Sequence, residues 1–211
     1  MKRTIGLALA AIALTGTAAA AQRASQWSIG PVIHGQNYSV GMDDTLRDGR
    51  AGPWFDFPYP NARAGHVHYV TRPVDGLDEA RAITLRYRID AAPGTHLRAR
   101  EHPDRDAALS LYFQRRGDDW SARGAYETYR WYAMPAKMMP LTPGTHEVTI
   151  DLKDDWKAVG ASRSNRQVAQ FRSALADAGQ IGFTFGSRGG RGHGVYATGP
   201  ARFTLLKFQI R

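Results

Sequence analysis

Residues 82–89 read AITLRYRI, and this stretch decides the class of fold. Every second side chain in it is apolar, and threonine or arginine stands between the apolar ones. The apolar set is Ile83, Leu85, Tyr87 and Ile89. Because side chains point alternately to the two faces of a β-strand, the pattern predicts a strand with one buried and one solvated face. Such strands are typical of antiparallel sheets.

Similar strand patterns recur on both sides of this stretch. Further strands are expected at residues 66–71, 109–116, 126–132, 146–152, 181–185 and 203–210. Helical spacing of apolar residues predicts one helix over residues 165–178, with Ser164 as its N-cap and Gly179 as its stop. Many half-buried strands and one short helix predict an all-β fold, a two-sheet antiparallel β-sandwich or jelly roll.

The N-terminus has the pattern of an export signal. A basic start, Met1-Lys2-Arg3, is followed by an apolar run over residues 5–14 and by small residues up to Ala21. We expect a signal peptide over residues 1–21 and a single jelly-roll domain over residues 22–211. The apolar run is shorter than the ~20 residues that span a bilayer, so no membrane span is expected. The chain has no cysteine, which favours a bacterial periplasmic or secreted protein.

The chain is basic, with a formal net charge of +9. Basic proteins can bind nucleic acid, anionic polysaccharide or a membrane surface. The positive residues are mostly arginine and are spread along the chain without the runs seen in nucleic-acid-binding tails, so no nucleic-acid partner is expected. Two explanations of the charge stay open, a genome rich in arginine codons and selection for an acidic ligand.

Residues 109–133 read LSLYFQRRGDDWSARGAYETYRWYA and mix aromatic, arginine and amide side chains. If residues 109–116 and 126–132 pair as a hairpin, alternation places Leu111 and Phe113 inside. Alternation alone does not decide which face of residues 126–132 is buried, because both are aromatic, but Trp131 with Tyr129 makes the better core. The outer face then carries Tyr112, Gln114, Arg116, Tyr126, Arg130 and Tyr132, with Trp120 in the connecting loop. Flat rings and planar donors suit the apolar faces and hydroxyl rims of sugars, and uronates or sulfated sugars would favour the arginines further. The alternative is that these aromatic side chains fill the sandwich core.

The histidines give a weaker signal. His66 and His68 are two apart on an expected strand, a spacing found in zinc sites, but no third ligand is evident nearby. His193 lies in a glycine-rich loop with Arg188 and Arg191, which could form an anion pocket or be a plain flexible loop. We include His193 among the candidate ligand-binding residues and expect no metal ligands.

Acidic residues do not form a catalytic or metal-binding motif in the sequence. Asp43, Asp44 and Asp48 cluster in one segment, but their spacing does not match an EF-hand loop, which favours a solvated turn. Paired carboxylates of the glycosidase type, a G-x-S-x-G elbow and a P-loop are not apparent. No catalytic residues are therefore assigned.

Three segments in the second half of the chain carry a family resemblance. They are PLTPGTHEVTIDLKDDW (residues 140–156), QFRSALADAGQIGFTFG (residues 170–186) and ARFTLLKFQI (residues 201–210). Their order, across residues 80–211, resembles galactose-binding-like β-jelly-roll domains of the carbohydrate-binding-module type. The resemblance implies a jelly roll that binds carbohydrate. Many members hold a structural calcium, partly through an aspartate in the final strand, where this chain has Lys207-Phe208-Gln209. A structural calcium stays open, and no other cofactor is expected.

Three functions follow from these observations. The first is an exported, non-catalytic carbohydrate-binding jelly-roll protein for a poly- or oligosaccharide, acidic ones included. The second is a polysaccharide lyase or a related carbohydrate-active enzyme, in which Gln114 and Arg116 would neutralise a uronate. Tyr132 or one of His66, His68 and His193 would then abstract the proton. The third is a structural or partner-binding periplasmic protein whose aromatic side chains form the core.

Overall fold

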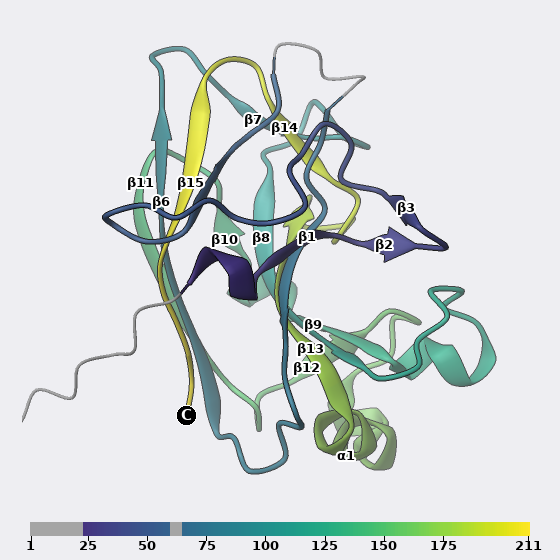
Figure 1. The fold of residues 1–211 in the computed structure, drawn as a ribbon. Coiled ribbons are helices and arrows are strands. Elements are labelled where there is room, and N and C mark those ends of the chain that lie inside the picture. The colour runs from purple at the N-terminus through teal and green to yellow at the C-terminus, as the bar shows by residue number, and fades with distance from the viewer. Residues whose placement is uncertain (1–22, 60–64) are drawn as a thin grey trace, which may run out of the picture.

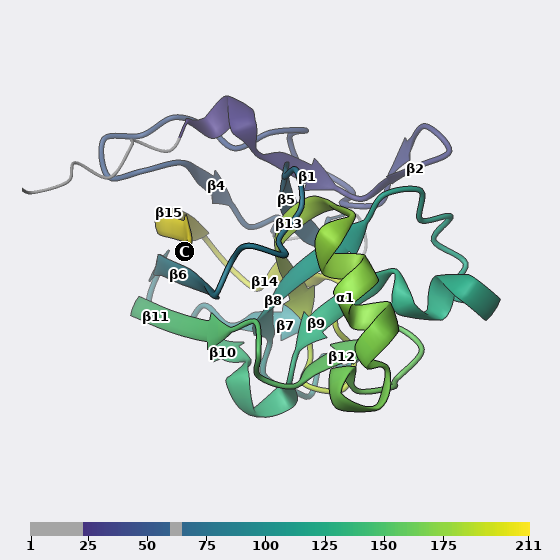
Figure 2. The same cartoon turned by 90° about the horizontal axis from the view of Figure 1, so that it is seen from below.

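The β-sandwich predicted from alternating side chains is present in the computed structural model, which describes residues 23–59 and 65–211. The expected signal peptide lies outside the described residues. Two antiparallel sheets face each other, and Figure 2 shows them as two layers with α1 (Val168–Ala176) at one end of the larger sheet. In the described part of the chain, no helix is long and apolar enough to cross a membrane.

The smaller sheet is built around the strand that the sequence predicted best. Its order is β11 (Gly144–Asp151), β6 (Ala82–Ala91), β15 (Ala201–Ile210) and β4 (Trp54–Asp56). Along β6 the four alternating apolar side chains from Ile83 to Ile89 are all buried, as expected. A bulge in β15 between Leu205 and Lys207 shifts the alternation by one residue. Both Leu205 and Phe208 therefore face the core.

The larger sheet provides the second layer. Its path runs β1 (Ser28–Gly30), β5 (Tyr69–Pro73), β13 (Ala178–Gly186), β8 (Ala108–Arg115), β9 (Arg130–Ala133) and β12 (Trp156–Ala158), and β10 (Met139–Pro140) pairs with β8. Apart from the β8–β9 pair, most neighbouring strands in this order are distant in sequence. The central strands β5, β13 and β8 come from three separate parts of the chain and are joined by antiparallel pairing.

Short elements connect the two layers. Two small ribbons pair β2 (Val32–Ile33) with β3 (Gln36–Asn37) and β7 (Leu97–Ala99) with β14 (Val195–Ala197). Four short 3-10 helices, η1 to η4, span Ala24–Gln26, Gly124–Thr128, Pro135–Lys137 and Ser164–Arg166. The β2–β3 ribbon projects from the end of β1 beyond the body of the sandwich (Figure 1).

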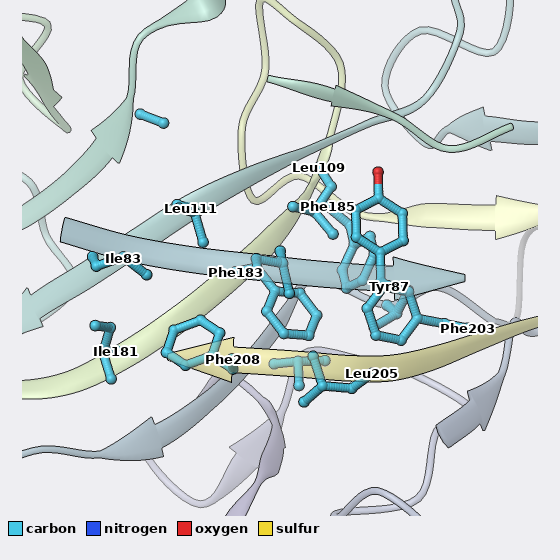
Figure 3. Close-up of a cluster of buried hydrophobic side chains, with 14 of the residues drawn as sticks. Ile83, Tyr87, Leu109, Leu111, Ile181, Phe183, Phe185, Phe203, Leu205 and Phe208 are labelled. Carbon is cyan, nitrogen blue, oxygen red and sulfur yellow. The ribbon is translucent and has the colours of Figure 1, made fainter. Parts of the chain in front are cut away.

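The inner faces of the two sheets meet in one aromatic core. Phe183 and Phe185 of β13 contact Phe203 of β15 at ring-centroid distances of 5.1 and 5.9 Å. Figure 3 shows these rings between the sheets, with Tyr87 and Leu205 beside them. Burial of such large apolar side chains is the main favourable term in folding, so this layer stabilises the sandwich.

The helix is shorter than predicted. It spans Val168–Ala176, and residues 164–166 form a 3-10 turn instead of its first turn. Ser164 is not the N-cap, because its Oγ accepts a hydrogen bond from the Trp156 backbone N–H at 2.9 Å. The helix ends at Ala176, and Gly179 belongs to β13. Phe171 fixes the helix against the end of the core.

The second strand of the predicted hairpin is also shorter than expected. Only Arg130–Ala133 is extended, and residues 124–128 form the 3-10 helix η2. The prediction that Tyr126 lies on the strand face is therefore wrong. The Trp131 indole Nε1–H donates to the Thr128 carbonyl at 2.7 Å, which fixes the turn immediately before the strand. A further deviation is β5, which begins at Tyr69 rather than at His66.

Candidate ligand-binding groove

Strand alternation divides the β8–β9 pair into an inner and an outer face, as predicted. Phe113 pairs with Trp131, and both lie in the core between the sheets. On the outer face Tyr112 pairs with Tyr132, and Gln114 pairs with Arg130. These outer side chains are nevertheless all buried. The outer face of the larger sheet is therefore a second, partly polar layer of packing.

The tyrosines of this layer are held by their hydroxyl groups. Tyr112 Oη donates to Gln114 Oε1 at 2.8 Å, and the hydroxyls of Tyr69 and Tyr132 lie 3.0 Å apart. Burial raises the pKa of Tyr112 well above its ordinary value, and it also raises the pKa of Tyr132. Both phenols are therefore neutral near pH 7 and act as hydrogen-bonding groups within the layer.

Asp118 joins this layer to the loop above it. Its Oδ2 lies 2.8 Å from Arg130 Nε and accepts a 2.8 Å hydrogen bond from Gln114 Nε2, and its Oδ1 accepts from the Trp120 backbone N–H at 3.1 Å. The Asp118 side chain is only 1% exposed. Burial raises the pKa of Asp118, and the nearby Arg130 opposes that rise. The carboxylate is thus a buried anchor for the loop.

Trp120 is held in an unusual backbone conformation. Its φ is +66°, in the left-handed region that costs energy for a residue with a Cβ. Arg130 compensates by donating from Nη2 to the Trp120 carbonyl at 3.0 Å and by placing its guanidinium 4.7 Å from the centroid of the indole ring. The indole also meets the Tyr69 ring edge-on at 5.6 Å. Strain that the surroundings enforce in this way is frequent at binding sites.

A groove of about 520 Å³ opens beside this loop. One wall is the end of β1 and the start of β2, with Pro31 and Val32, and the opposite wall includes Trp120. The floor is the outer face of β5, β13 and β8, with Thr71, Gln180 and Tyr112 among its residues. Cavities of this size are typical of small-ligand sites. Figure 1 shows β1 next to the strands of the larger sheet, with β2 continuing from its end.

The structure brings together part of the predicted set of site residues. The members that line the groove are Tyr112, Gln114, Arg116 and Trp120. Arg130 and Tyr132 are buried and contact this layer without lining the groove. Tyr126 lies on η2 and contacts the Tyr129 ring at 4.8 Å.

His193 lies away from the groove lining, in the loop before β14. Its Nδ1 is 2.6 Å from Glu101 Oε1, which makes it part of an ion pair when the imidazole is protonated. In the same loop, Arg188 Nη1 donates to the Pro135 carbonyl at 3.0 Å.

Sequence reasoning missed the rest of the groove. Thr71 and Gln180 were not considered, although Thr71 stands in the strand expected at residues 66–71 and Gln180 directly precedes the one expected at residues 181–185. Alternation with the core residues Val70 and Ile181 would have identified these two. The opposite wall, formed by Pro31 and Val32, carries no such signal, since its position depends on which strand β1 joins.

His66 and His68 form a buried pair in the segment just before β5 begins. Their ring centroids lie 4.7 Å apart, and His68 Nδ1 is 2.7 Å from the Gly192 carbonyl oxygen. Burial lowers the pKa of His68 to about 4 and also lowers the pKa of His66, so both rings are neutral near pH 7. Within residues 23–59 and 65–211 no group of three or more His, Cys, Asp and Glu side chains is placed to hold a metal.

The aspartates of the 43–48 segment have separate structural contacts. Asp43 pairs with Arg47 at 2.7 Å, Asp44 accepts from Asn37 Nδ2 at 3.1 Å, and Asp48 accepts from the Ala24 backbone N–H at 3.0 Å. Each carboxylate thus stabilises the chain that leads into and out of β1.

The groups considered for lyase chemistry are dispersed. Gln114 and Arg116 line the groove. Tyr132 and the three candidate histidines also belong to the described residues, but none of them lines the groove. The Tyr132 hydroxyl is engaged by Tyr69, and burial raises its pKa away from the range useful for a base. The groove therefore has the side chains considered for neutralising a uronate, but none of the side chains considered as the base that abstracts the proton.

No family model matches the chain, and no curated protein matches it. Among solved structures, the chain is similar to a crystal structure described as a non-crystalline cellulose specific carbohydrate-binding module, CBM28. The TM-score is 0.43 at 11% identity, over 89% of this chain and 87% of that one. Because a likeness this distant says nothing of individual residues, the site and its ligand depend on the chain's own side chains.

Proposed function

We propose that the groove binds a poly- or oligosaccharide and that the protein acts as an exported, non-catalytic carbohydrate-binding jelly roll. The observation that carries this proposal is the Trp120 ring on one wall of an open groove with a hydroxyl and an amide, those of Thr71 and Gln180, in its floor. Sugar rings present an apolar face and a rim of hydroxyls. An aromatic wall and a polar floor match both features.

The fixed position of Trp120 supports this proposal. The loop that carries the ring is tied to the sheet by Asp118 through a backbone hydrogen bond and by Arg130 through a second one. A ring that is already immobile loses little conformational entropy when a ligand stacks on it, which increases affinity. The apolar side chains of Pro31 and Val32 also line the groove and add apolar surface to it.

Two further parts of the proposal have separate support. The non-catalytic role is supported by the dispersal of the candidate acid and base groups. Neither Tyr132 nor His193 lines the groove, and the Tyr132 hydroxyl is engaged by that of Tyr69 and the His193 imidazole by Glu101. Export to the periplasm or the medium is supported by the basic and apolar start of the chain and by the absence of cysteine.

Isothermal calorimetry and affinity electrophoresis against a panel of neutral and acidic polysaccharides test the proposal. The chain should bind at least one of them, and Trp120→Ala should weaken that binding by about tenfold or more, because buried aromatic contacts dominate binding energy. Trp54→Ala is the matched control, since Trp54 is a half-buried tryptophan on β4 in the other sheet.

The outcome at the two tryptophans separates this proposal from its alternatives. A folded chain that binds no polysaccharide, or one that loses equal affinity through Trp54→Ala, would overturn the assignment of the groove. Release of unsaturated ends from a uronate polymer, seen as ultraviolet absorbance, would show lyase activity and overturn the non-catalytic role.

A further inference from the structure

The arginines that line the groove are already neutralised by carboxylates of the chain. Arg115 Nε lies 2.9 Å from Asp177 Oδ2. Arg116 reaches two partners, with Nη1 at 3.2 Å from Asp177 Oδ1 and Nη2 at 2.5 Å from Asp75 Oδ1. Hydrogen bonds from the two arginines lower the pKa of Asp177, which keeps its carboxylate ionised.

The charged residues next to the Trp120 loop are balanced as well. Arg130 pairs with Asp118 at 2.8 Å, and the two side chains are only 8% and 1% exposed. The guanidiniums of Arg115, Arg116 and Arg130 therefore face three carboxylates, those of Asp75, Asp118 and Asp177. These three arginines and three aspartates together carry no net charge, although the whole chain is strongly basic.

The polar side chains that remain without a partner are uncharged. Ser28, Thr71 and Gln180 line the groove, and within the described residues none of their side chains makes a hydrogen bond. Two hydroxyls and one amide can both donate and accept, as sugar hydroxyls do. By contrast, the Gln114 amide already has partners, since it accepts from Tyr112 and donates to Asp118.

We infer that the ligand of the groove is an uncharged glycan rather than a uronate or a sulfated sugar. This inference rests on the proposed function and specifies the class of sugar. An anionic sugar would have to displace Asp75 or Asp177 from Arg116, or lie near their carboxylates without a cation of its own. A neutral sugar can bind to Ser28, Thr71 and Gln180 and leave every ion pair intact.

Calorimetric titration with two sets of defined oligosaccharides tests the class of ligand. Neutral hexaoses of glucose, mannose, xylose and galactose form one set, and hexamers of galacturonate, mannuronate and guluronate form the other. The best neutral hexaose should bind about tenfold or more tightly than the best hexauronate. Raising the salt concentration from ~50 to ~500 mM should leave the neutral affinity almost unchanged, because no charge is exchanged.

Freeing the arginine should reverse the preference. In Asp75→Asn with Asp177→Asn, Arg116 loses both of its partners. Affinity for the hexauronates should rise by about tenfold, as expected for one new charge-assisted hydrogen bond. The matched control is Asp56→Asn with Asp90→Asn, which changes the net charge equally on the other sheet. Gln180→Lys, which adds a cation to the floor, tests the same point if the double variant does not fold.

The outcomes test separately the class of sugar and carbohydrate binding itself. Tighter binding of a hexauronate by the unmodified chain, or a steep loss of affinity with salt, would overturn the neutral class and leave the carbohydrate-binding proposal standing. Failure of Gln180→Lys and the double variant to gain hexauronate affinity would also overturn it. Binding of neither set, nor of any polysaccharide in the panel, would overturn the proposed function itself.

Discussion

Asp118 is a single buried carboxylate on which both the loop and the tyrosine layer depend. It is the ion-pair partner of the equally buried Arg130 and accepts hydrogen bonds from Gln114 and Trp120. A charge buried without its partner is unfavourable, and breaking a buried pair from one side costs several kcal/mol. The position of Trp120 and the stability of the sheet are therefore coupled through one side chain.

The variant Asp118→Asn tests this coupling. It leaves Arg130 buried without a counter-charge, so the free energy of unfolding should fall by about 3 kcal/mol in urea denaturation. Groove affinity should fall in parallel, because the Trp120 loop loses its anchor. The neighbouring Asp119→Asn is the control, since the Asp119 carboxylate is solvated and bonds only locally to Ser121. Equal stabilities of the two variants would contradict the role given to Asp118.

His68 gives the folded state a defined dependence on pH. Burial lowers its pKa to about 4, below the ordinary value of 6.5. Between these values the unfolded chain binds a proton that the folded chain does not, so the free energy of unfolding decreases as the pH falls from 6.5 to 4. At ~1.4 kcal/mol per pKa unit, the loss should be on the order of 3 kcal/mol.

Urea denaturation at a series of pH values measures this loss, with His68→Asn as the reference. The asparagine amide can still donate to the Gly192 carbonyl, but it does not titrate. The variant should therefore show a shallower decline between pH 6.5 and pH 4. Parallel declines in both proteins would show that His68 is not the group responsible. His66, Arg100 and His193 face His68 and remain unchanged in the comparison.

Helix α1 depends on one aromatic side chain for its position. Phe171 is buried and contacts Trp131 at 4.8 Å and Phe113 at 5.8 Å between ring centroids. Phe171→Ala should lower the free energy of unfolding by about 3 to 4 kcal/mol, because it removes apolar contact and leaves a cavity. Val168→Ala on the same helix is the control, since Val168 is 48% exposed. Urea midpoints of the two variants that coincide would refute this role of Phe171.

At the level of single elements, the sequence predicted correctly those strands in which apolar and polar side chains alternate. Residues 82–89 and 109–116 lie in strands whose inner and outer faces are as predicted, because burial of one face enforces a period of two. Residues 126–128 were misassigned, since a 3-10 turn that ends at Thr128 can carry the same aromatic composition as a strand, whereas residues 130–132 lie in β9 as expected. The start of the helix was also predicted wrongly, because Ser164 accepts a hydrogen bond from Trp156 of the preceding strand β12 and does not cap the helix.

At the level of the whole molecule, the groove arises from strand order. Its residues come from β1 and β2, from β5, from the β8 loop and from β13, which the sheet places side by side. The aromatic stretch of residues 109–133 predicted the wall that contains Trp120 and the part of the floor that belongs to β8. The position of β1 beside β5 depends on long-range pairing, from Ser28 with Thr71 to Gly30 with Tyr69. No local sequence pattern predicts this pairing. The opposite wall was therefore beyond prediction from the sequence.

The two sheets should unfold as one unit. Trp27, which follows η1, contacts Phe183 of the larger sheet and Phe208 of the smaller one at 5.7 and 5.0 Å. The same core continues through Phe55, Phe185 and the remaining buried side chains of both layers. A shared core makes separate unfolding of either sheet unfavourable, because the other would expose its apolar face. Cooperative, two-state behaviour is thus expected for residues 22–211.

Calorimetry and two spectroscopic probes test this expectation together. The scan should show a single transition whose calorimetric and van't Hoff enthalpies agree. Tryptophan fluorescence reports on both layers, since Trp54 lies in the smaller sheet and Trp131 and Trp156 lie in the larger one. Its midpoint in urea should coincide with that of far-ultraviolet circular dichroism. Two transitions, or midpoints that differ between the probes, would show that the sheets are independent and that the groove sits on a layer able to fold alone.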